Sequence, residues 1–359
     1  MGLKTPLYGD HVAAGGRMVD FGGWDMPLHF GSQLKEHLAV RASWGLFDVS
    51  HMGICDVTGP NALAFLRRLV ACDPGRLQPG AAQYGVMLLE DGGIVDDLLV
   101  YRLGENRYRL VINAGTRQGD LAWMRPLSGG YPQTEIRERT DLAMIAIQGP
   151  HALSQVVDLL PDGEGIARLA SFHGLETAEG WFISRTGYTG EPGVEVMLPV
   201  AEVGPLWQRL REAGAALCGL GCRDTLRLEA GMNLYGMDMD RGNHPLESGI
   251  AWTVHWDPPQ RDFVGRAALE VLRARGDHAV RVGLVLEGQG VLRRDQAVLL
   301  DGKEIGRTTS GTFSPSLGCG IAMARVQAKL AVGSTCQVQV RDKALTVRVV
   351  RPPFLGKKE

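Results

Sequence analysis

The chain has 359 residues and a formal net charge of -2, with 45% hydrophobic and 22% charged residues. This composition is ordinary for a globular protein of two or three domains, and the lack of a block of like charges gives no support to nucleic-acid binding. Residues 1–16 lack an apolar signal core, and no stretch approaches the roughly 18 apolar residues of a membrane span. We therefore predict a cytoplasmic protein without a membrane segment. The six scattered cysteines predict reduced thiols and no zinc site.

The first predicted elements are a helix over 33–44 and a strand over 53–58. Ser32 suits the N-cap of this helix, and Leu34 and Leu38 form its apolar face. After the strand, Gly59-Pro60 starts a second helix, because proline fits the first helical turn. The apolar residues of that helix recur at helical spacing: Ala62, Phe65, Leu66 and Leu69.

The same order of elements returns later in the chain. An apolar strand ending at Gln148 precedes Gly149-Pro150, and a helix is predicted from there through Leu160. Each helix is followed by a glycine-rich hairpin, at 91–93 and at 187–193. The pattern predicts an internal β-α-β-β repeat, although two unrelated Gly-Pro helix starts would give the same short motifs. In a true repeat, Asp97 and Glu195, which follow the two hairpin turns, would occupy comparable places.

Two more helices and a set of short strands complete the predicted elements. A helix over 201–213 has one apolar side, and a second helix is capped by Asp224 and ends at Gly231. Arg223 and Arg227, four residues apart, share a face if this helix reaches back that far. After about residue 276, alternating apolar residues and the hairpin signal Asp301-Gly302 predict a small barrel or sandwich.

Asp96 and Asp97 stand in the middle of a predicted strand, between Val95 and Leu98. Aspartate is a poor strand former, so two in succession indicate a functional site, a bulge or a turn acid with a satisfied partner. Adjacent strand residues point to opposite faces, so one of the two acids faces the interior.

Glu195 enters an apolar strand directly after a glycine-rich turn, between Val194 and Val196. A buried carboxylate needs a partner, because leaving it unpaired costs several kcal/mol or neutralises it. Arg223 or Arg227 would provide a structural salt bridge. The N3–H and 2-amino edge of a pterin would present the same planar pair of donors to the carboxylate.

Several motifs follow one another along the chain. They are Val19-Asp20-Phe21-Gly22-Gly23-Trp24, Phe47-Asp48-Val49-Ser50-His51-Met52, Gly92-Gly93-Ile94-Val95-Asp96-Asp97, Gly187-Tyr188-Thr189-Gly190-Glu191, Arg223-Asp224-Thr225-Leu226-Arg227-Leu228-Glu229-Ala230-Gly231 and Thr309-Ser310-Gly311-Thr312-Phe313-Ser314-Pro315. In this order they resemble the aminomethyltransferase (T-protein) family of the glycine cleavage system, and the resemblance covers essentially the whole chain.

The resemblance implies an α+β, three-lobed folate-binding aminomethyltransferase fold with β-α-β-β repeat units and a carboxy-terminal β-barrel. It implies three domains: a central folate-binding α+β domain from 1–52 plus 141–256, a second α+β domain from 53–140, and a carboxy-terminal β-barrel domain from 277–359. Some family members continue past a Pro-Phe pair into a tyrosine-containing tail. Here the corresponding residues are Leu355-Gly356-Lys357-Lys358.

The resemblance also implies a reaction, a partner and a set of site residues. The one-carbon unit of an aminomethyl group on the lipoyl arm of the H-protein passes to tetrahydrofolate, giving 5,10-methylenetetrahydrofolate, ammonia and the dihydrolipoyl arm. Tetrahydrofolate is a co-substrate, and no metal is expected. Asp97 matches the catalytic aspartate and Glu195 the acid that binds the pterin. The other substrate-binding residues carried over are Arg223, Tyr188, Trp252, Tyr84, Asn113 and Met52.

Two other functions are compatible with a folate-binding scaffold of this kind. One is a demethylase that takes its one-carbon unit from an N- or S-methyl donor while keeping Glu195. The other is a non-catalytic folate-binding factor, whose relatives carry a Lys-Gly-Cys-Tyr motif. This chain lacks that motif, and its glycine-rich stretch reads Arg185-Thr186-Gly187-Tyr188, which argues against the second function.

Overall fold

The computed structural model describes residues 2–356, so Lys357 and the rest of the tail lie outside the described residues. The chain divides into two compact units. Unit 1 comprises Met1–Gly85, Asp96–Gly187 and Glu191–Arg223, and unit 2 comprises Val86–Val95, Tyr188–Gly190 and Asp224–Glu359. Within residues 2–356, none of the helices combines the length and the apolar character needed to cross a bilayer.

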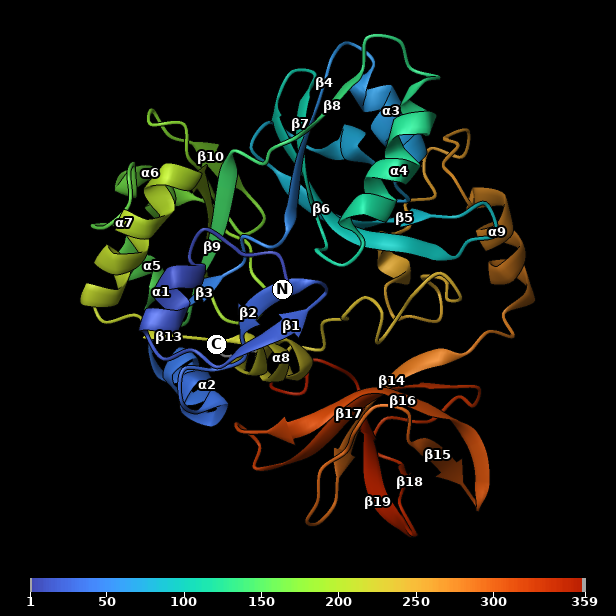
Figure 1. Cartoon of the computed structure of the whole chain (residues 1–359). Helices are drawn as coiled ribbons and strands as arrows, with labels where there is room; N and C mark the ends of the chain where they lie inside the picture. The colour runs from blue at the N-terminus through green and yellow to red at the C-terminus, as the bar shows by residue number, and fades with distance from the viewer. Residues whose placement is uncertain (1, 357–359) are drawn as a thin grey trace. The chain divides into compact units, whose positions relative to one another are not determined.

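Unit 1 is built around two sheets (Figure 1). The six-stranded sheet has the order β10-β11-β12-β9-β3-β13, and the five-stranded sheet has the order β5-β6-β7-β4-β8. The tip of the β5–β6 hairpin, residues 86–95, belongs to unit 2. The strands are β3 (Gly45–Asp48), β4 (Gly53–Thr58), β5 (Ala82–Leu88), β6 (Ile94–Gly104), β7 (Arg107–Ile112), β8 (Glu135–Glu138), β9 (Leu142–Gln148), β10 (Gly174–Glu176), β11 (Phe182–Ser184), β12 (Gly193–Pro199) and β13 (Ala216–Leu217).

A short hairpin and the remaining helices complete unit 1. The hairpin pairs β1 (Met18–Phe21) with β2 (Trp24–Pro27). The helices are α1 (Tyr8–Ala13), α2 (Gln33–Ala42), α3 (Ala62–Leu69), η1 (Pro74–Arg76), α4 (Arg117–Ser128), α5 (Ala152–Val156), α6 (Gly163–Arg168) and α7 (Val200–Glu212), and α8 (Leu220–Glu229) runs from unit 1 into unit 2.

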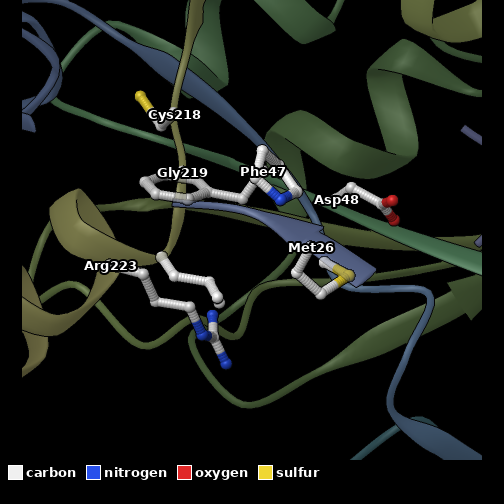
Figure 2. A pocket seen from close by; sticks show the side chains of 8 residues that line it. Met26, Phe47, Asp48, Cys218, Gly219 and Arg223 are labelled. Carbon is white, nitrogen blue, oxygen red and sulfur yellow. The ribbon is translucent and has the colours of Figure 1, made fainter. Parts of the chain in front are cut away.

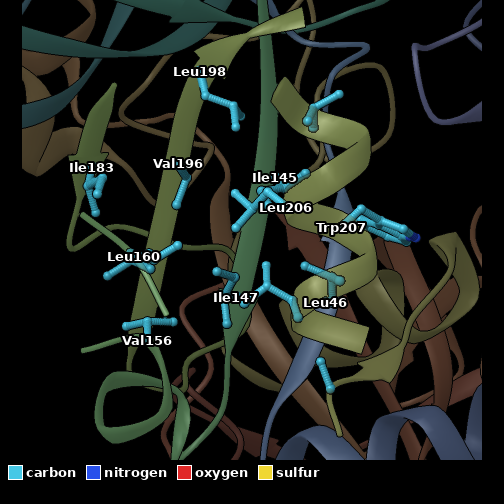
Figure 3. Packing of buried hydrophobic residues seen from close by; sticks show 14 of the residues in the cluster. Leu46, Ile145, Ile147, Val156, Leu160, Ile183, Val196, Leu198, Leu206 and Trp207 are labelled. Carbon is cyan, nitrogen blue, oxygen red and sulfur yellow. The ribbon is translucent and has the colours of Figure 1, made fainter. Parts of the chain in front are cut away.

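The core of the six-stranded sheet lies between β9, β12 and the apolar side of α7 (Figure 3). As predicted, the buried side of α7 consists of Val203, Leu206, Trp207 and Leu210. Val194, Val196 and Leu198 of β12 point into this core. Because strand residues alternate between faces, Glu195 projects to the opposite side of the sheet.

The predicted internal repeat is present in the two sheets. The segment β4-α3-β5-β6-β7 gives the strand order β5-β6-β7-β4, and the segment β9-α5-β10-β11-β12 gives the matching order β10-β11-β12-β9. In both sheets a further strand pairs antiparallel with the first strand of the repeat: β8 pairs with β4, and β3 pairs with β9. Each repeat therefore contributes one more strand than the predicted β-α-β-β unit.

The two Gly-Pro helix starts have a shared physical cause. Gly59 and Gly149 both have positive φ, 113° and 140°. A Cβ atom would lie 1.8 Å from the Gln133 carbonyl oxygen at Gly59 and 2.2 Å from the Ser43 carbonyl oxygen at Gly149. Each carbonyl stands two residues before the strand that pairs with the first strand of the repeat, β8 beside β4 or β3 beside β9. Only glycine fits where the chain turns this close to the incoming strand.

The repeat corrects one prediction about the acids. Asp97 lies on β6, the second strand after its helix, whereas Glu195 lies on β12, the third. Strand β6 corresponds to β11 and strand β12 corresponds to β7. The expectation that Asp97 and Glu195 occupy comparable places is therefore wrong. The two glycine-rich turns are not equivalent, because the first follows β5, the first strand after its helix, and the second follows β11, the second strand after its helix.

Helix α2 also differs from its prediction. Ser32 caps it, accepting a hydrogen bond from the Lys35 backbone nitrogen at 3.4 Å. Leu34 and Leu38, however, are 46% and 45% exposed. The buried residues of the helix are Glu36, His37 and Val40. The Glu36 carboxylate accepts hydrogen bonds from the backbone nitrogens of Phe30 and Gly219, which compensates for its burial.

Two other helices have bounds that the sequence did not predict. Helix α5 ends at Val156 and does not continue through Leu160. Helix α8 begins at Leu220, so Asp224 is an interior residue and not the N-cap. The Asp224 carboxylate instead accepts a hydrogen bond from Arg227 Nε at 2.8 Å.

Unit 2 contains η2 (Ala251–Thr253), α9 (Arg266–Arg275) and a closed six-stranded barrel. Its strands follow the order β14-β17-β16-β15-β18-β19, and β19 pairs back onto β14. They are β14 (Val280–Leu286), β15 (Ala297–Leu300), β16 (Lys303–Ser314), β17 (Cys319–Val326), β18 (Thr335–Val340) and β19 (Lys343–Val350). The α+β class with a carboxy-terminal β-barrel is thus confirmed, while the division into three domains stays a prediction.

A leucine-to-alanine substitution should destabilise the fold more on the buried face of α7 than on the exposed face of α2. Leu206→Ala removes a side chain that is 2% exposed, so we expect a loss of unfolding free energy of about 2–5 kcal/mol. Leu34→Ala, on the exposed face of α2, should change it by about 0.5 kcal/mol or less. Urea denaturation of the two variants measures the difference, and equal losses would contradict the assignment of these faces.

Candidate functional site

Three of the predicted site residues meet on the five-stranded sheet of unit 1. Asp97 on β6 is half-buried, and each of its carboxylate oxygens has its own donor. The Tyr84 hydroxyl, on β5, donates to Asp97 Oδ2 at 2.9 Å. Asn113 Nδ2, just after β7, donates to Asp97 Oδ1 at 3.0 Å. Donors on both oxygens fix the plane of the carboxylate.

The surroundings of Asp97 make its charge unfavourable. Burial and the neighbouring charge of Asp96 raise the pKa of Asp97 to about 7, although the hydrogen bonds from Tyr84 and Asn113 act in the opposite direction. An ordinary aspartate ionises near pH 4. Asp97 therefore changes charge near neutral pH, where a small change in its surroundings decides whether it holds a proton.

Glu195 lies on β12 and is 6% exposed. Its Oε2 accepts a hydrogen bond from the Thr186 hydroxyl at 2.5 Å. Among residues 2–356, Glu195 forms no ion pair, and its Oε1 accepts no hydrogen bond. Burial raises the pKa of Glu195, while the Thr186 hydrogen bond and the charge of Arg223 act to lower it. A structural salt bridge from Arg223 or Arg227 therefore does not explain this acid.

A group of buried hydroxyls holds Thr186 in place beneath Glu195. The Tyr101 hydroxyl lies 3.0 Å from Thr186 Oγ1 and 3.2 Å from Ser184 Oγ. Ser184 and Thr186 are themselves 2.8 Å apart. These contacts leave one carboxylate oxygen of Glu195 with a fixed donor and the other available to a planar donor group.

Arg223 lies in the first turns of α8 and borders a small pocket of unit 1 (Figure 2). The pocket is also lined by Met26, Phe47 and Asp48. Burial, together with the positive charge of Arg223, lowers the pKa of His51 to about 4, so this histidine is neutral at physiological pH. Arg223 thus places one cation near both His51 and Glu195.

The other predicted site residues have different surroundings. Tyr188 and Trp252 belong to unit 2. The Tyr188 hydroxyl donates to the Asn233 carbonyl oxygen, and Trp252, in η2, is 65% exposed. Met52, in unit 1, is half-buried in the turn after β3. Arg227 binds Asp238 at 2.7 Å and Ser310 at 2.9 Å within unit 2, which gives it a structural role in that unit.

Three residues around the carboxylates were not among the site residues predicted from the sequence. Asp96 accepts two hydrogen bonds from Asn113, and Thr186 donates to Glu195. Asp96 is part of one of the quoted motifs and Thr186 directly precedes another, so the sequence contains a signal for both. Asp120 on α4 raises the pKa of Asp96 and has no such signal. Within the described part of the chain, no cluster of three or more His, Cys, Asp or Glu side chains is suited to a metal ion, and the described cysteines are free thiols.

The comparisons with known proteins agree along the whole chain. The GCVT N-terminal domain model matches residues 7–258, and the glycine cleavage T-protein C-terminal barrel domain model matches residues 280–355. An aminomethyltransferase of Chromobacterium violaceum is 50% identical over 99% of this chain and 98% of its own length. The crystal structure of a glycine cleavage system aminomethyltransferase T from Bartonella henselae is 36% identical, covers 99% of this chain and 98% of its own, and has a TM-score of 0.93. The chain belongs to the glycine cleavage T-protein family.

Proposed function

We propose that this chain transfers the one-carbon unit of aminomethyl-lipoyl H-protein to tetrahydrofolate, with Asp97 as its catalytic carboxylate and Glu195 as its pterin-binding carboxylate. The chain is an aminomethyltransferase of the glycine cleavage system, given its family and its 50% identity to an aminomethyltransferase over nearly the full length. The H-protein, tetrahydrofolate, the cytoplasmic location and the roles of the individual residues are parts of the proposal.

The observation that carries the proposal is the Asp97 carboxylate held by Tyr84 and Asn113, with a pKa of about 7. In the transfer, the carbon between the lipoyl sulfur and the amino group becomes bonded to the two folate nitrogens N5 and N10. Two folate N–H protons end on the departing sulfur and ammonia, which balances the reaction. The carbon passes through a cationic, iminium-like stage.

Asp97 suits both requirements of that transfer. A poorly solvated carboxylate with fixed donors stabilises a cation strongly, because little reorganisation is needed when the charge develops. A pKa near 7 also allows the same group to accept and return a proton under physiological conditions. The remaining rate enhancement comes from holding both reactants in one orientation.

Glu195 suits the recognition of a pterin ring. The N3–H and 2-amino groups of the ring form a planar donor pair, and an ionised carboxylate accepts from both at once. Thr186 occupies only Oε2 of Glu195, and that oxygen has a second acceptor site. The raised pKa of Glu195 indicates that its carboxylate is incompletely solvated. A ligand that donates two hydrogen bonds to this carboxylate would therefore bind favourably.

The assay for the activity supplies aminomethyl-loaded H-protein with and without tetrahydrofolate and measures the release of ammonia. We expect release to depend on tetrahydrofolate, and Asp97→Asn to lower turnover by about 100- to 10,000-fold while tetrahydrofolate affinity changes only a few-fold. Asp141→Asn, an exposed acid paired with Arg139, is the control. Full turnover in Asp97→Asn would contradict the catalytic role, and folate-independent release would favour another acceptor.

The pterin role of Glu195 predicts a binding effect. Glu195→Gln keeps the size of the side chain but loses the charge and one acceptor, so tetrahydrofolate affinity should fall about 10- to 100-fold. Isothermal titration calorimetry measures the change. Glu176→Gln is the matched control, because Glu176 lies on β10 of the same sheet and forms an exposed pair with Arg107. Equal affinities of the parent and Glu195→Gln would refute the assignment.

A further inference from the structure

Asp96 is a buried acid that the proposed chemistry leaves without a role. It precedes Asp97 on β6, projects to the other side of the strand and has no exposed surface. Asn113 donates to it twice: the backbone nitrogen to Oδ2 at 3.1 Å and Nδ2 to Oδ1 at 2.9 Å. An acid buried so completely requires compensation beyond two neutral donors.

That compensation comes from a second buried acid, Asp120, in the first turn of α4. Asp120 also has no exposed surface, and its carboxyl group acts on that of Asp96, so burial and this second acid together raise the pKa of Asp96 well above its ordinary value. Ionised carboxylates have only acceptors and repel each other, so two neighbouring buried carboxyl groups are stable together only when one of them holds a proton. The Asp96–Asp120 pair therefore holds at least one proton and carries at most one negative charge, as expected for two acids in contact in a buried site.

The Asn113 side chain connects this pair to Asp97. Its Nδ2 donates to Asp96 Oδ1 at 2.9 Å, to Asp97 Oδ1 at 3.0 Å and to the Asp97 carbonyl oxygen at 3.1 Å. If the amide were reversed, its oxygen would face three acceptors. Asp96 thus adds to the forces that keep the donor side of the Asn113 amide toward Asp97.

We propose that Asp96 is a positioning residue for Asp97: sharing a proton with Asp120, it orients the Asn113 amide and places negative charge behind the reaction carboxylate. This inference rests on the proposed role of Asp97. The negative charge favours the protonated form of Asp97 and increases its attraction for a cation at the reacting carbon.

The other charged and titratable groups around the pair are few. Tyr84 on β5 contacts Asp97, the reaction carboxylate on β6. Cys55 on β4 lies near Asp120, and burial raises the pKa of its thiol to about 12, so it stays neutral. Arg117 of α4 is paired with Glu138 of β8, which largely cancels the charge of both. Among these groups, Asp96 is the charged neighbour that raises the pKa of Asp97.

The test compares the pH dependence of kcat/KM in Asp96→Asn and Asp120→Asn. In Asp96→Asn the remaining charge lies on Asp120 and no longer on the neighbour that raises the pKa of Asp97, so this pKa falls and the acid limb of the profile should move down by about one pH unit. In Asp120→Asn the new amide donates to Asp96, which becomes fully ionised, so the limb should stay or move up. A loss of packing alone would not separate the two variants in this way.

Parallel measurements on Asp97→Asn separate this inference from the proposed function. Full turnover in Asp97→Asn would remove the catalytic role and the positioning role together. Loss of turnover in Asp97→Asn, with acid limbs that are unmoved or both lowered in Asp96→Asn and Asp120→Asn, would overturn the positioning role alone. Tetrahydrofolate affinity should change by only a few-fold in Asp96→Asn.

Infrared spectroscopy tests the shared proton without an assay of activity. At about pH 9, the difference spectrum of the parent minus Asp120→Asn should contain the carbonyl stretch of one protonated carboxyl group. The same band should be missing from the parent minus Asp97→Asn spectrum, because Asp97 is ionised at that pH. If Asp96→Asn does not fold, the Asp120→Asn spectrum decides the matter, and absence of the band would overturn the inference.

Discussion

The Asp97 carboxylate is held where its own charge is disfavoured, and the arrangement around it follows from that constraint. Burial and the charge of Asp96 favour its protonated form, while Tyr84 and Asn113 stabilise the ionised form by donating to its two oxygens. The opposing effects place its pKa at about 7. A cation beside such a carboxylate stabilises its ionised form and is itself stabilised. The proposed transfer requires this stabilisation, because the transferred carbon becomes cationic.

The repeated sheets explain how the chain builds two different carboxylate sites from one plan. Each repeat presents a strand, a helix and three further strands. In the first repeat, Asp97 lies on β6, the middle one of the three strands that follow the helix, and contacts residues of β5 and of the end of β7. In the second, Glu195 lies on the last strand, above the hydroxyls of β11 and the following turn. The same framework therefore supports one acid with neutral donors on both oxygens and one with a donor on only one.

Much of this arrangement could be predicted from the sequence, because it depends on local rules. Positive φ at Gly59 and Gly149 follows from a helix that starts directly after a strand, and the apolar spacing of α7 determines its buried face. The α2 helix shows where such rules fail. Its buried acid Glu36 accepts hydrogen bonds from the backbone of nearby Phe30 and of Gly219, which is distant in sequence, while the two leucines that define the apolar stripe are exposed.

The candidate site was predictable to the same extent. Asp97, Glu195 and their glycine-rich turns stand in recognisable motifs, and Tyr84 and Asn113 were carried over from the family. Asp120 was not predictable, because its contact with Asp96 depends on how α4 packs against the sheet. The helix shows no local pattern that marks one acid in its first turn as buried.

The most direct test of the central claim is the pKa of Asp97 in the folded protein without ligands. The difference in unfolding free energy between the parent and Asp97→Asn, measured from about pH 5 to about pH 9, reports this pKa by linkage. Below its folded pKa of about 7 the folded protein keeps a proton that the unfolded chain has lost, so the parent should lose stability relative to Asp97→Asn as pH rises toward 7 and level off above it. A difference that stays constant over this range would mean that Asp97 ionises like an ordinary aspartate and would contradict the account.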